Sequence, residues 1–322
     1  MPVVARVEDL SVDYITLRGV VRVLNGVSID VREGEILALV GETGSGKTTL
    51  GLSIPRLLPP NAVVRSGKIL FDGVDVFKLS EDEVRELRGS KITVIFQEPR
   101  ISLNPVMRIG DQLAEVLEAH VGIDKKTAYG RVEDMLRKVG LYDPQRVMKS
   151  YPFELSGGMA QRVMIAMAML LSPRLIIADE PTSALDVTVQ AQIIDLMKEL
   201  ISSYRTSVLY ITHDLALVAE IADRVAVMYA GDIVEVGDVY DVFYNPLHPY
   251  TQGLLESIPK IGYRGKLRAM PGEVPSLLNP PPACRFHPRC PFVMDECRKV
   301  KPKAYKRGDH IVLCHLYKEE GK

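Results

Sequence analysis

The chain has no cysteine in its first 283 residues, and all four of its thiols lie in the C-terminal tail. Its first residues, MPVVARVEDL, lack the apolar core and the cleavage site of a signal peptide, so we expect the protein in the cytosol. Disulfide bonds seldom persist in that compartment. We therefore expect the thiols to be metal ligands rather than disulfide partners: Cys284, Cys290, Cys297 and Cys314.

Long apolar runs and an excess of one charge are also absent. The longest apolar run, Val163 to Leu171, has nine residues, whereas about 20 are needed to cross a bilayer. Forty basic side chains stand against 41 acidic ones, and the net charge of −1 creates no field that attracts nucleic acid. These absences predict a chain that does not span a membrane and has no nucleic-acid partner.

What the chain does contain is short apolar stretches that alternate with helical patterns. The first two, VVARVEDLSVDY and VRVLNGVSIDV, predict antiparallel strands, with Asn25 and Gly26 as a turn. KITVIF, RLIIADE, TSVLYITHD and RVAVMYAGDIVEVG predict further strands, and residues 109–171 read as mostly helical. This alternation is typical of an α/β fold with a largely parallel sheet and crossover helices.

After Asp238 proline becomes frequent and the apolar periodicity fades. We expect a first domain over residues 1–238 and a small irregular module over residues 239–322. Such a module has a weak core by itself, so a metal or a partner surface should help to stabilise it. We expect the preceding domain to have a separate core.

The stretch GETGSGKT fits the phosphate-loop pattern, and it lies between a predicted strand and a predicted helix, the context that the pattern requires. Glycines let backbone N–H groups surround phosphates, Lys47 can reach the outer phosphates, and Thr48 can offer its hydroxyl to Mg²⁺. We therefore predict an ATP site at Gly41, Glu42, Thr43, Gly44, Ser45, Gly46, Lys47, Thr48 and Thr49.

Two later motifs support a phosphate chemistry. LIIADEP places Asp179 and Glu180 at the end of an apolar strand, where one carboxylate can hold Mg²⁺ and the other can polarise an attacking water. LSGGMAQR precedes an apolar helix, with Ser156 as a natural N-cap and Gly157 and Gly158 exposing N–H groups. A plain helix start explains the serine but not the glycine pair, so we predict a second anion-binding helix end.

Together these motifs resemble the ATP-binding subunits of ABC transporters, in which an LSGG signature about 115 residues after the phosphate loop is the distinguishing element. The resemblance implies a Q-loop at Gln97 in FQEP, a D-loop at SALD over residues 183–186, and a switch histidine at His213 in ITHD. It also places Tyr14 where the family stacks an aromatic ring on adenine, although a buried core tyrosine is the alternative. One departure is Ala160, where the family often has a longer polar residue.

The implied fold is a P-loop NTPase of the ABC ATPase type, with an antiparallel β subdomain and a helical subdomain at about residues 98–170. Two such domains meet head to tail, with each ATP between the phosphate loop of one and the signature of the other. The implied roles are phosphoryl neutralisation by Lys47, Mg²⁺ binding by Thr48, Gln97 and Asp179, water activation by Glu180, γ-phosphate contact by His213, and completion of the second subunit's site by Ser156, Gly157 and Gly158.

Three segments narrow the resemblance to the dipeptide and oligopeptide permease branch: FQEPRISLNP, NPLHPYTQGLL and PPACRFHPRCPFVMDEC. The likeness covers nearly the whole chain. It implies an ATPase at the cytoplasmic face of the membrane that powers peptide import. Its implied partners are a second ATP-binding subunit, identical or paralogous, two membrane-spanning permease subunits and, indirectly, a solute-binding protein. In that branch the tail cysteines are associated with a [4Fe–4S] cluster.

The cysteine spacing by itself does not identify the metal. Five, six and sixteen residues separate successive cysteines, which matches neither zinc ribbons nor ferredoxins. His287 and His315 lie nearby in the sequence and could replace a thiolate in a zinc site, so iron–sulfur, zinc and no metal all stay open. Two functional alternatives also stay open: an ABC-type ATPase of DNA repair, for which the sequence lacks a long heptad insertion, and an ATPase regulated by the redox state of the cluster.

Overall fold

The computed structural model describes residues 2–183, 185–258 and 270–318, and the chain divides into two compact units. The unit that we call helical comprises residues 1–4, 32–34 and 78–210. The unit that we call β-rich comprises residues 5–31, 35–77 and 211–322.

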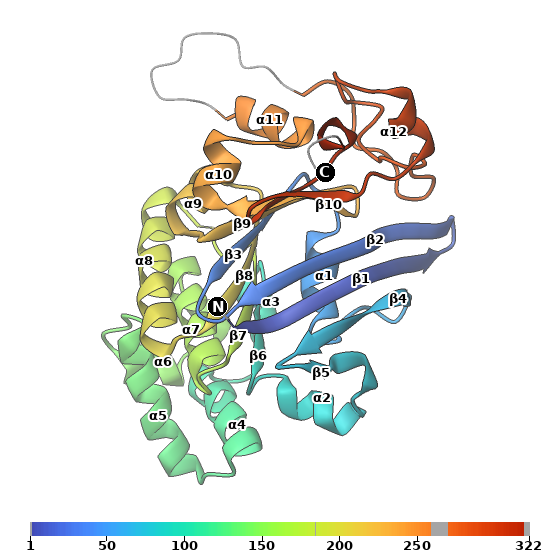
Figure 1. The fold of residues 1–322 in the computed structure, drawn as a ribbon. Coiled ribbons are helices and arrows are strands. Elements are labelled where there is room, and N and C mark those ends of the chain that lie inside the picture. The colour runs from blue at the N-terminus through green and yellow to red at the C-terminus, as the bar shows by residue number, and fades with distance from the viewer. Residues whose placement is uncertain (1, 184, 259–269, 319–322) are drawn as a thin grey trace. The chain divides into compact units, whose positions relative to one another are not determined.

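The helical unit contains most of the α-helices that the described residues form (Figure 1). Its strands β6 and β7 pair in parallel, with Ile95 opposite Ala178. Its elements are α2 (Glu81–Leu87), β6 (Ile92–Ile95), α3 (Pro99–Ser102), α4 (Ile109–Val121), α5 (Lys125–Lys138), α6 (Pro144–Lys149), η2 (Pro152–Glu154), α7 (Gly157–Met169), β7 (Leu175–Asp179), α8 (Val187–Tyr204) and the start of β8 (Ser207–Thr212).

Local signals in the sequence set the ends of these helices. Asp124, Asp143, Ser156 and Asp186 each accept a hydrogen bond from a backbone N–H in the first turn of the following helix, which satisfies donors that have no partner inside the helix. Gly122 ends α4 in the left-handed conformation. Among the described residues, no helix is long and apolar enough to cross a membrane.

The β-rich unit contains two groups of paired strands. In one the order is β2, β1, β4 and β5, and β4 pairs antiparallel with both of its neighbours. In the other, β9 pairs parallel with β3 and antiparallel with β10, while β12 pairs antiparallel with β10 and β11. The elements are β1 (Val3–Thr16), β2 (Gly19–Arg32), β3 (Ile36–Val40), α1 (Lys47–Ser53), β4 (Ala62–Phe71), β5 (Val74–Asp75), η1 (Val76–Lys78), α9 (Leu215–Ile221), β9 (Arg224–Tyr229), β10 (Asp232–Asp238), α10 (Val239–Tyr244), α11 (Pro249–Glu256), α12 (Asp295–Lys299), β11 (Ala304–Arg307), β12 (His310–Leu313) and η3 (His315–Tyr317).

The turn predicted at Asn25 and Gly26 is wrong, because both residues lie inside the unbroken strand β2. Gly26 has a left-handed φ of 69° and donates its N–H to Ser11 Oγ at 3.0 Å. Asn25 is held by the β9–β10 hairpin: its N–H reaches Gly231 O at 3.0 Å and its Nδ2 reaches Asp232 Oδ1 at 2.9 Å. Contacts with a distant hairpin therefore override the turn preference of an Asn-Gly pair.

The preceding domain does not have the fully separate core that we expected, whereas the tail has, as expected, only a small apolar cluster of its own, formed by Leu247, Val312 and Cys314. Phe286 belongs to the same buried cluster as Val40 of β3 and Tyr250 of α11, and Cys284 and Cys290 pack against that cluster. Strand β12 also extends the ladder of β9 and β10. The reason is that the tail is too small to bury all its apolar side chains within itself, so Phe286 is buried against existing strands. The predicted domains, residues 1–238 and 239–322, stay a prediction, because shared packing does not locate the boundary between them.

Candidate ATP site and cysteine segment

The phosphate loop, residues 41–48, connects β3 to α1 as the sequence predicts. A Cβ on Gly41 would lie 2.1 Å from Met228 O, so only glycine fits there. The Lys47 side chain is buried, and its Nζ donates to the carbonyl oxygens of Gly41 at 2.8 Å and Glu42 at 3.1 Å. The loop therefore curves around the Lys47 ammonium and fixes its position.

Ser45 and Thr48 differ in exposure within this loop. Ser45 is 1% exposed, and its Oγ has no hydrogen-bond partner among the described residues. Thr48 is exposed, so its hydroxyl is open to a ligand. Because buried hydroxyls are nearly always hydrogen-bonded, the orphaned Ser45 Oγ suits a loop that a bound phosphate completes.

Tyr14 lies on β1, and its hydroxyl is 2.8 Å from Thr49 Oγ1 in the first turn of α1. Tyr14 is half-buried, whereas Thr49 is buried. This contact joins the predicted adenine residue to the helix that follows the phosphate loop. The stacking role of Tyr14 stays a prediction.

In the helical unit, the structure brings Gln97 and Glu180 together. Gln97 follows β6, Glu180 follows β7, and Gln97 Nε2 donates to Glu180 Oε2 at 3.1 Å. Asp179 is the last residue of β7 and is half-buried. Because β6 and β7 run in parallel, their carboxyl ends lie at one edge, as expected for acids that act at the strand ends.

The signature segment begins α7 in the same unit. Ser156 Oγ accepts a backbone N–H three residues on at 3.3 Å, as the predicted N-cap. A Cβ on Gly158 would lie 2.7 Å from Val189 Cγ1 of α8, so packing requires glycine there. A Cβ on Gly157 would meet Leu185 at an ordinary 3.6 Å. Packing therefore does not explain Gly157, and its predicted anion-binding role stays a prediction.

The switch and D-loop residues occupy loops after β8 and β7. His213 follows β8 and is exposed. Of the D-loop, residue 184 lies outside the described residues, Ser183 Oγ donates to Glu180 O at 3.1 Å, and Asp186 caps α8 by accepting from Val189 N at 3.0 Å. The roles predicted for these residues toward ATP stay predictions.

Sequence reasoning missed two residues that hold the phosphate loop from the tail. Arg289 forms a double hydrogen bond with the Glu42 carboxylate, Nη1 to Oε2 at 2.7 Å and Nη2 to Oε1 at 3.2 Å. Tyr250 Oη accepts the backbone N–H of Glu42 at 3.0 Å. The sequence contained one local feature that could have drawn attention to Arg289, namely its position directly before Cys290.

The four thiols are free; Cys284 and Cys290 pack against one buried cluster of the β-rich unit, and Cys284 N donates to Cys297 O at 3.1 Å. Burial raises the pKa of Cys284 to about 12, and the nearby thiols of Cys297, Cys314 and Cys290 raise it as well. Burial also raises the pKa of Cys314 to about 11. In the part of the chain that the structure describes, no group of three or more His, Cys, Asp or Glu side chains is placed to hold a metal ion.

The histidines that could have replaced a thiolate make backbone contacts. His287 Nδ1 lies 2.9 Å from Cys284 O, and His315 Nε2 lies 2.9 Å from Val300 O. Each ring thus already has a backbone partner at one nitrogen.

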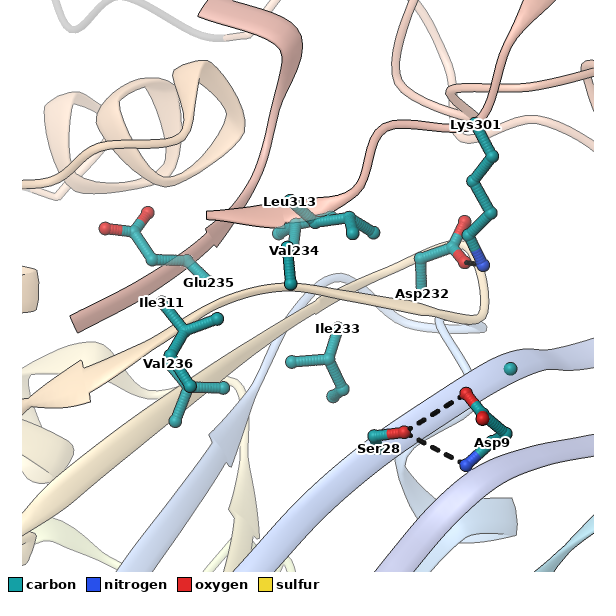
Figure 2. Close-up of a pocket in the computed structure, with 12 residues that line it drawn as sticks. Asp9, Ser28, Asp232, Ile233, Val234, Glu235, Val236, Lys301, Ile311 and Leu313 are labelled. Atoms are coloured by element: carbon teal, nitrogen blue, oxygen red, sulfur yellow. Dashed lines mark hydrogen bonds and ion pairs between the residues drawn. The ribbon is translucent and has the colours of Figure 1, made fainter. Parts of the chain in front are cut away.

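A pocket of about 360 Å³ in the β-rich unit is lined by β10, β12 and residues of β1 and β2 (Figure 2). Its polar groups bond to one another: Lys301 Nζ lies 2.6 Å from Asp232 Oδ1, and Asp9 N donates to Ser28 Oγ at 2.9 Å. None of the described residues that line it is a predicted ATP residue. The Lys301–Asp232 ion pair therefore attaches the tail to β10. The pocket is not part of the candidate ATP site.

Comparison with protein families matches residues 24–183 to the family described as ABC transporter, and residues 234–297 to the C-terminal region of oligopeptide/dipeptide transporters. The dipeptide transport ATP-binding protein of Bacillus subtilis is 48% identical over 319 residues, covering 98% of this chain and 95% of its own. That of Caldanaerobacter subterraneus is 44% identical over 322 residues, covering 99% and 98%. The chain therefore belongs to the ATP-binding subunits of ABC transporters.

This ABC subunit falls in the dipeptide/oligopeptide branch, as the sequence motifs predicted. The dimeric structure of MJ0796, a bacterial ABC transporter cassette, matches it with a TM-score of 0.65 at 26% identity, covering 73% of this chain and 98% of that one. The P-loop cassette fold is thereby confirmed. The predicted function, the ATPase subunit of an ABC peptide importer, is confirmed as well, and the DNA-repair alternative is set aside.

Proposed function

We propose that this subunit binds MgATP at its phosphate loop and that hydrolysis there drives the import of di- or oligopeptides. The observation that carries the proposal is the loop geometry: Lys47 Nζ is held by two loop carbonyls, and the buried Ser45 Oγ lacks a partner among the described residues. A curved loop with a fixed ammonium is complementary to a polyphosphate.

Hydrolysis transfers the γ-phosphoryl group of ATP to a water oxygen and releases ADP, and the protein must stabilise the developing charge and accept a proton from the water. The hydrogen bond from Gln97 to Glu180 supports water activation, because it orients the carboxylate that would receive the proton. We assign phosphoryl neutralisation to Lys47, Mg²⁺ binding to Thr48, Gln97 and Asp179, water activation to Glu180, γ-phosphate contact to His213, and adenine stacking to Tyr14.

A second ATP-binding subunit, identical or paralogous, would place its signature on this ATP. The exposed Ser156 at the start of α7, and Gly157, whose glycine is not explained by packing, support an anion-binding role for that segment. The related MJ0796 cassette is dimeric, and another structure of it holds ADP and phosphate after hydrolysis. We therefore propose a head-to-tail pair of ATP-binding subunits.

The membrane-spanning permease partners would dock on the helical unit. A shallow groove of about 430 Å³ lies there, lined by residues of α4, the segment before it and Tyr151. Val106, which lines the groove, is 80% exposed and offers an apolar contact to a partner. A permease segment covering this groove would hold the subunit peripherally at the cytoplasmic face and couple it indirectly to a solute-binding protein.

For the tail, we propose that the four cysteines hold a [4Fe–4S] cluster with a structural role. Support comes from the packing of Cys284 and Cys290 against one buried cluster, from the hydrogen bond of Cys284 N to Cys297 O at 3.1 Å, and from burial, since Cys297 and Cys314 are both less than a tenth exposed. Cysteine thiolates are the usual ligands of such clusters. We retain residues 1–238 as the ATPase domain, with a helical subdomain at about 98–170, and residues 239–322 as the extension.

The variant Glu180→Gln tests the ATPase assignment. It should keep ATP binding but lower turnover by about two orders of magnitude or more, since the amide cannot take a proton from water. The measurement is steady-state phosphate release beside fluorescent-nucleotide binding. Turnover equal to that of the wild type would remove Glu180 from the reaction.

A further inference from the structure

We propose that Arg289 is a positioning residue for ATP turnover, through which the cysteine segment holds the phosphate loop in its working shape. The inference rests on the proposed ATP site and adds to it a contact that reaches the loop from the far end of the chain. Arg289 touches Glu42, and Glu42 in turn touches Lys47, the residue assigned to the phosphates.

The Arg289 guanidinium has a single orientation because all three of its nitrogens are engaged. Nη1 and Nη2 grip the Glu42 carboxylate, Nη1 also lies 3.4 Å from Tyr229 Oη, and Nε donates to Pro271 O at 3.0 Å. The side chain is 5% exposed, and its guanidinium lies 5.7 Å from the centre of the Tyr229 ring. A planar fork of this kind has no equivalent in lysine.

Glu42 is fixed at three points, and two of them belong to the tail. Its carboxylate is bound by Arg289, its N–H is bound by Tyr250 Oη, and its carbonyl oxygen accepts Lys47 Nζ. Tyr250 is fully buried, with ring centroids 4.6 Å from Tyr229 and 5.5 Å from Phe286. A shift of Glu42 therefore moves a carbonyl that holds the catalytic ammonium.

Charge gives a second reason for the pair. Glu42 places a carboxylate in the loop that would receive a triphosphate, and two anions so close repel each other. Arg289 compensates the carboxylate with a cation that cannot lose its proton at physiological pH. Without Arg289, the uncompensated Glu42 carboxylate would repel the triphosphate. It would therefore weaken ATP binding more than it would lower the rate at which bound ATP is hydrolysed.

This pair also connects the loop to the thiols. Arg289 directly precedes Cys290, and Cys284 and Cys290 pack against the buried cluster that contains Tyr250. Disorder in the cysteine segment would therefore release Glu42, although the thiols themselves make no contact with the nucleotide in this proposal.

The test compares four variants of the full chain: Arg289→Gln, Arg289→Lys, Glu42→Gln and the Glu42→Gln/Arg289→Gln double variant. The matched control is Arg298→Gln, which removes an exposed arginine from the same segment. We expect Arg289→Gln to raise the KM for MgATP roughly tenfold while kcat changes less than about threefold, as for loss of a buried charge-assisted pair. Arg289→Lys should raise the KM about threefold, because it keeps the charge and loses the fork.

The double variant separates positioning from general destabilisation. In the Glu42→Gln background, Arg289→Gln should change the KM by less than about threefold, because no carboxylate is left unpaired. Additive effects, or a KM for Arg289→Gln within about twofold of the wild-type value, would overturn the inference. If Arg289→Gln does not fold, Arg289→Lys replaces it in the test, and a wild-type KM for MgATP in Arg289→Lys would overturn the inference. Lys47→Ala tests the underlying site separately: wild-type ATP binding and turnover in that variant would refute the ATP site itself.

Discussion

Acidification should charge His248 and weaken the β-rich unit, and the size of the effect follows from the surroundings of this side chain. His248 is 1% exposed, its Nδ1 accepts the N–H of Tyr250 at 3.0 Å, and its ring lies 5.5 Å from that of Phe286. Burial lowers its pKa from the ordinary 6.5 to about 4, and the nearby Glu235 carboxylate opposes this shift only in part. The folded protein therefore favours the neutral ring.

The sign and the pH window follow from this difference. A group whose pKa is lowered in the folded state contributes stability that is fully present above its unfolded pKa, here 6.5, and that is lost as the pH falls through about 4. At 1.36 kcal/mol for each pKa unit, the largest possible contribution of His248 is about 3 kcal/mol. Most of it should be lost by pH 4.5.

His248→Asn is the matched variant, because asparagine keeps an acceptor for the N–H of Tyr250 at the start of α11 and does not titrate. Urea unfolding can be followed by tyrosine fluorescence, since the chain has 13 tyrosines and no tryptophan. Between pH 7.5 and 4.5 the wild type should lose about 2 kcal/mol more free energy of unfolding than His248→Asn. An equal loss in the two proteins would refute the reasoning, as would a His248 NMR signal that titrates near pH 6.5.

Two further predictions concern the signature and the tail. Gly158→Ala should lower the free energy of unfolding by about 1–3 kcal/mol, because its Cβ would lie 2.7 Å from Val189 Cγ1; thermal unfolding measures this, and adding Val189→Ala should restore most of the loss. A fully stable Gly158→Ala would show that α7 and α8 do not pack so closely. Anaerobically purified wild type should be brown, with about four iron atoms per chain, and Cys290→Ser should lose both iron and ATP affinity. Colourless wild-type protein that contains zinc would refute the cluster, and iron-free Cys290→Ser with normal ATP affinity would show that the cysteine segment does not act on the phosphate loop.

Much of the candidate site follows from short stretches of sequence, because its chemistry is local. The glycines of the phosphate loop, Lys47 within it and Ser156 as a helix cap all depend on neighbours only a few residues away. Gln97 was indicated only by the resemblance to the family, and its contact with Glu180, 83 residues away, is then accounted for because the carboxyl ends of parallel strands meet at one edge of a sheet. Local sequence pattern was sufficient for the phosphate loop and the helix cap, whereas Gln97 needed the resemblance as well.

Only the tertiary structure shows how the tail is attached to the phosphate loop and the strands. Glu42 and Arg289 are 247 positions apart, and neither residue type nor spacing indicates that they pair. Asn25 and Gly26 have the composition of a hairpin turn, yet a hairpin more than 200 residues later holds Asn25 inside a strand. In each case a buried polar group found its partner in a distant element, and a contact of that kind leaves no periodicity in the sequence because it is selected by packing of the whole chain.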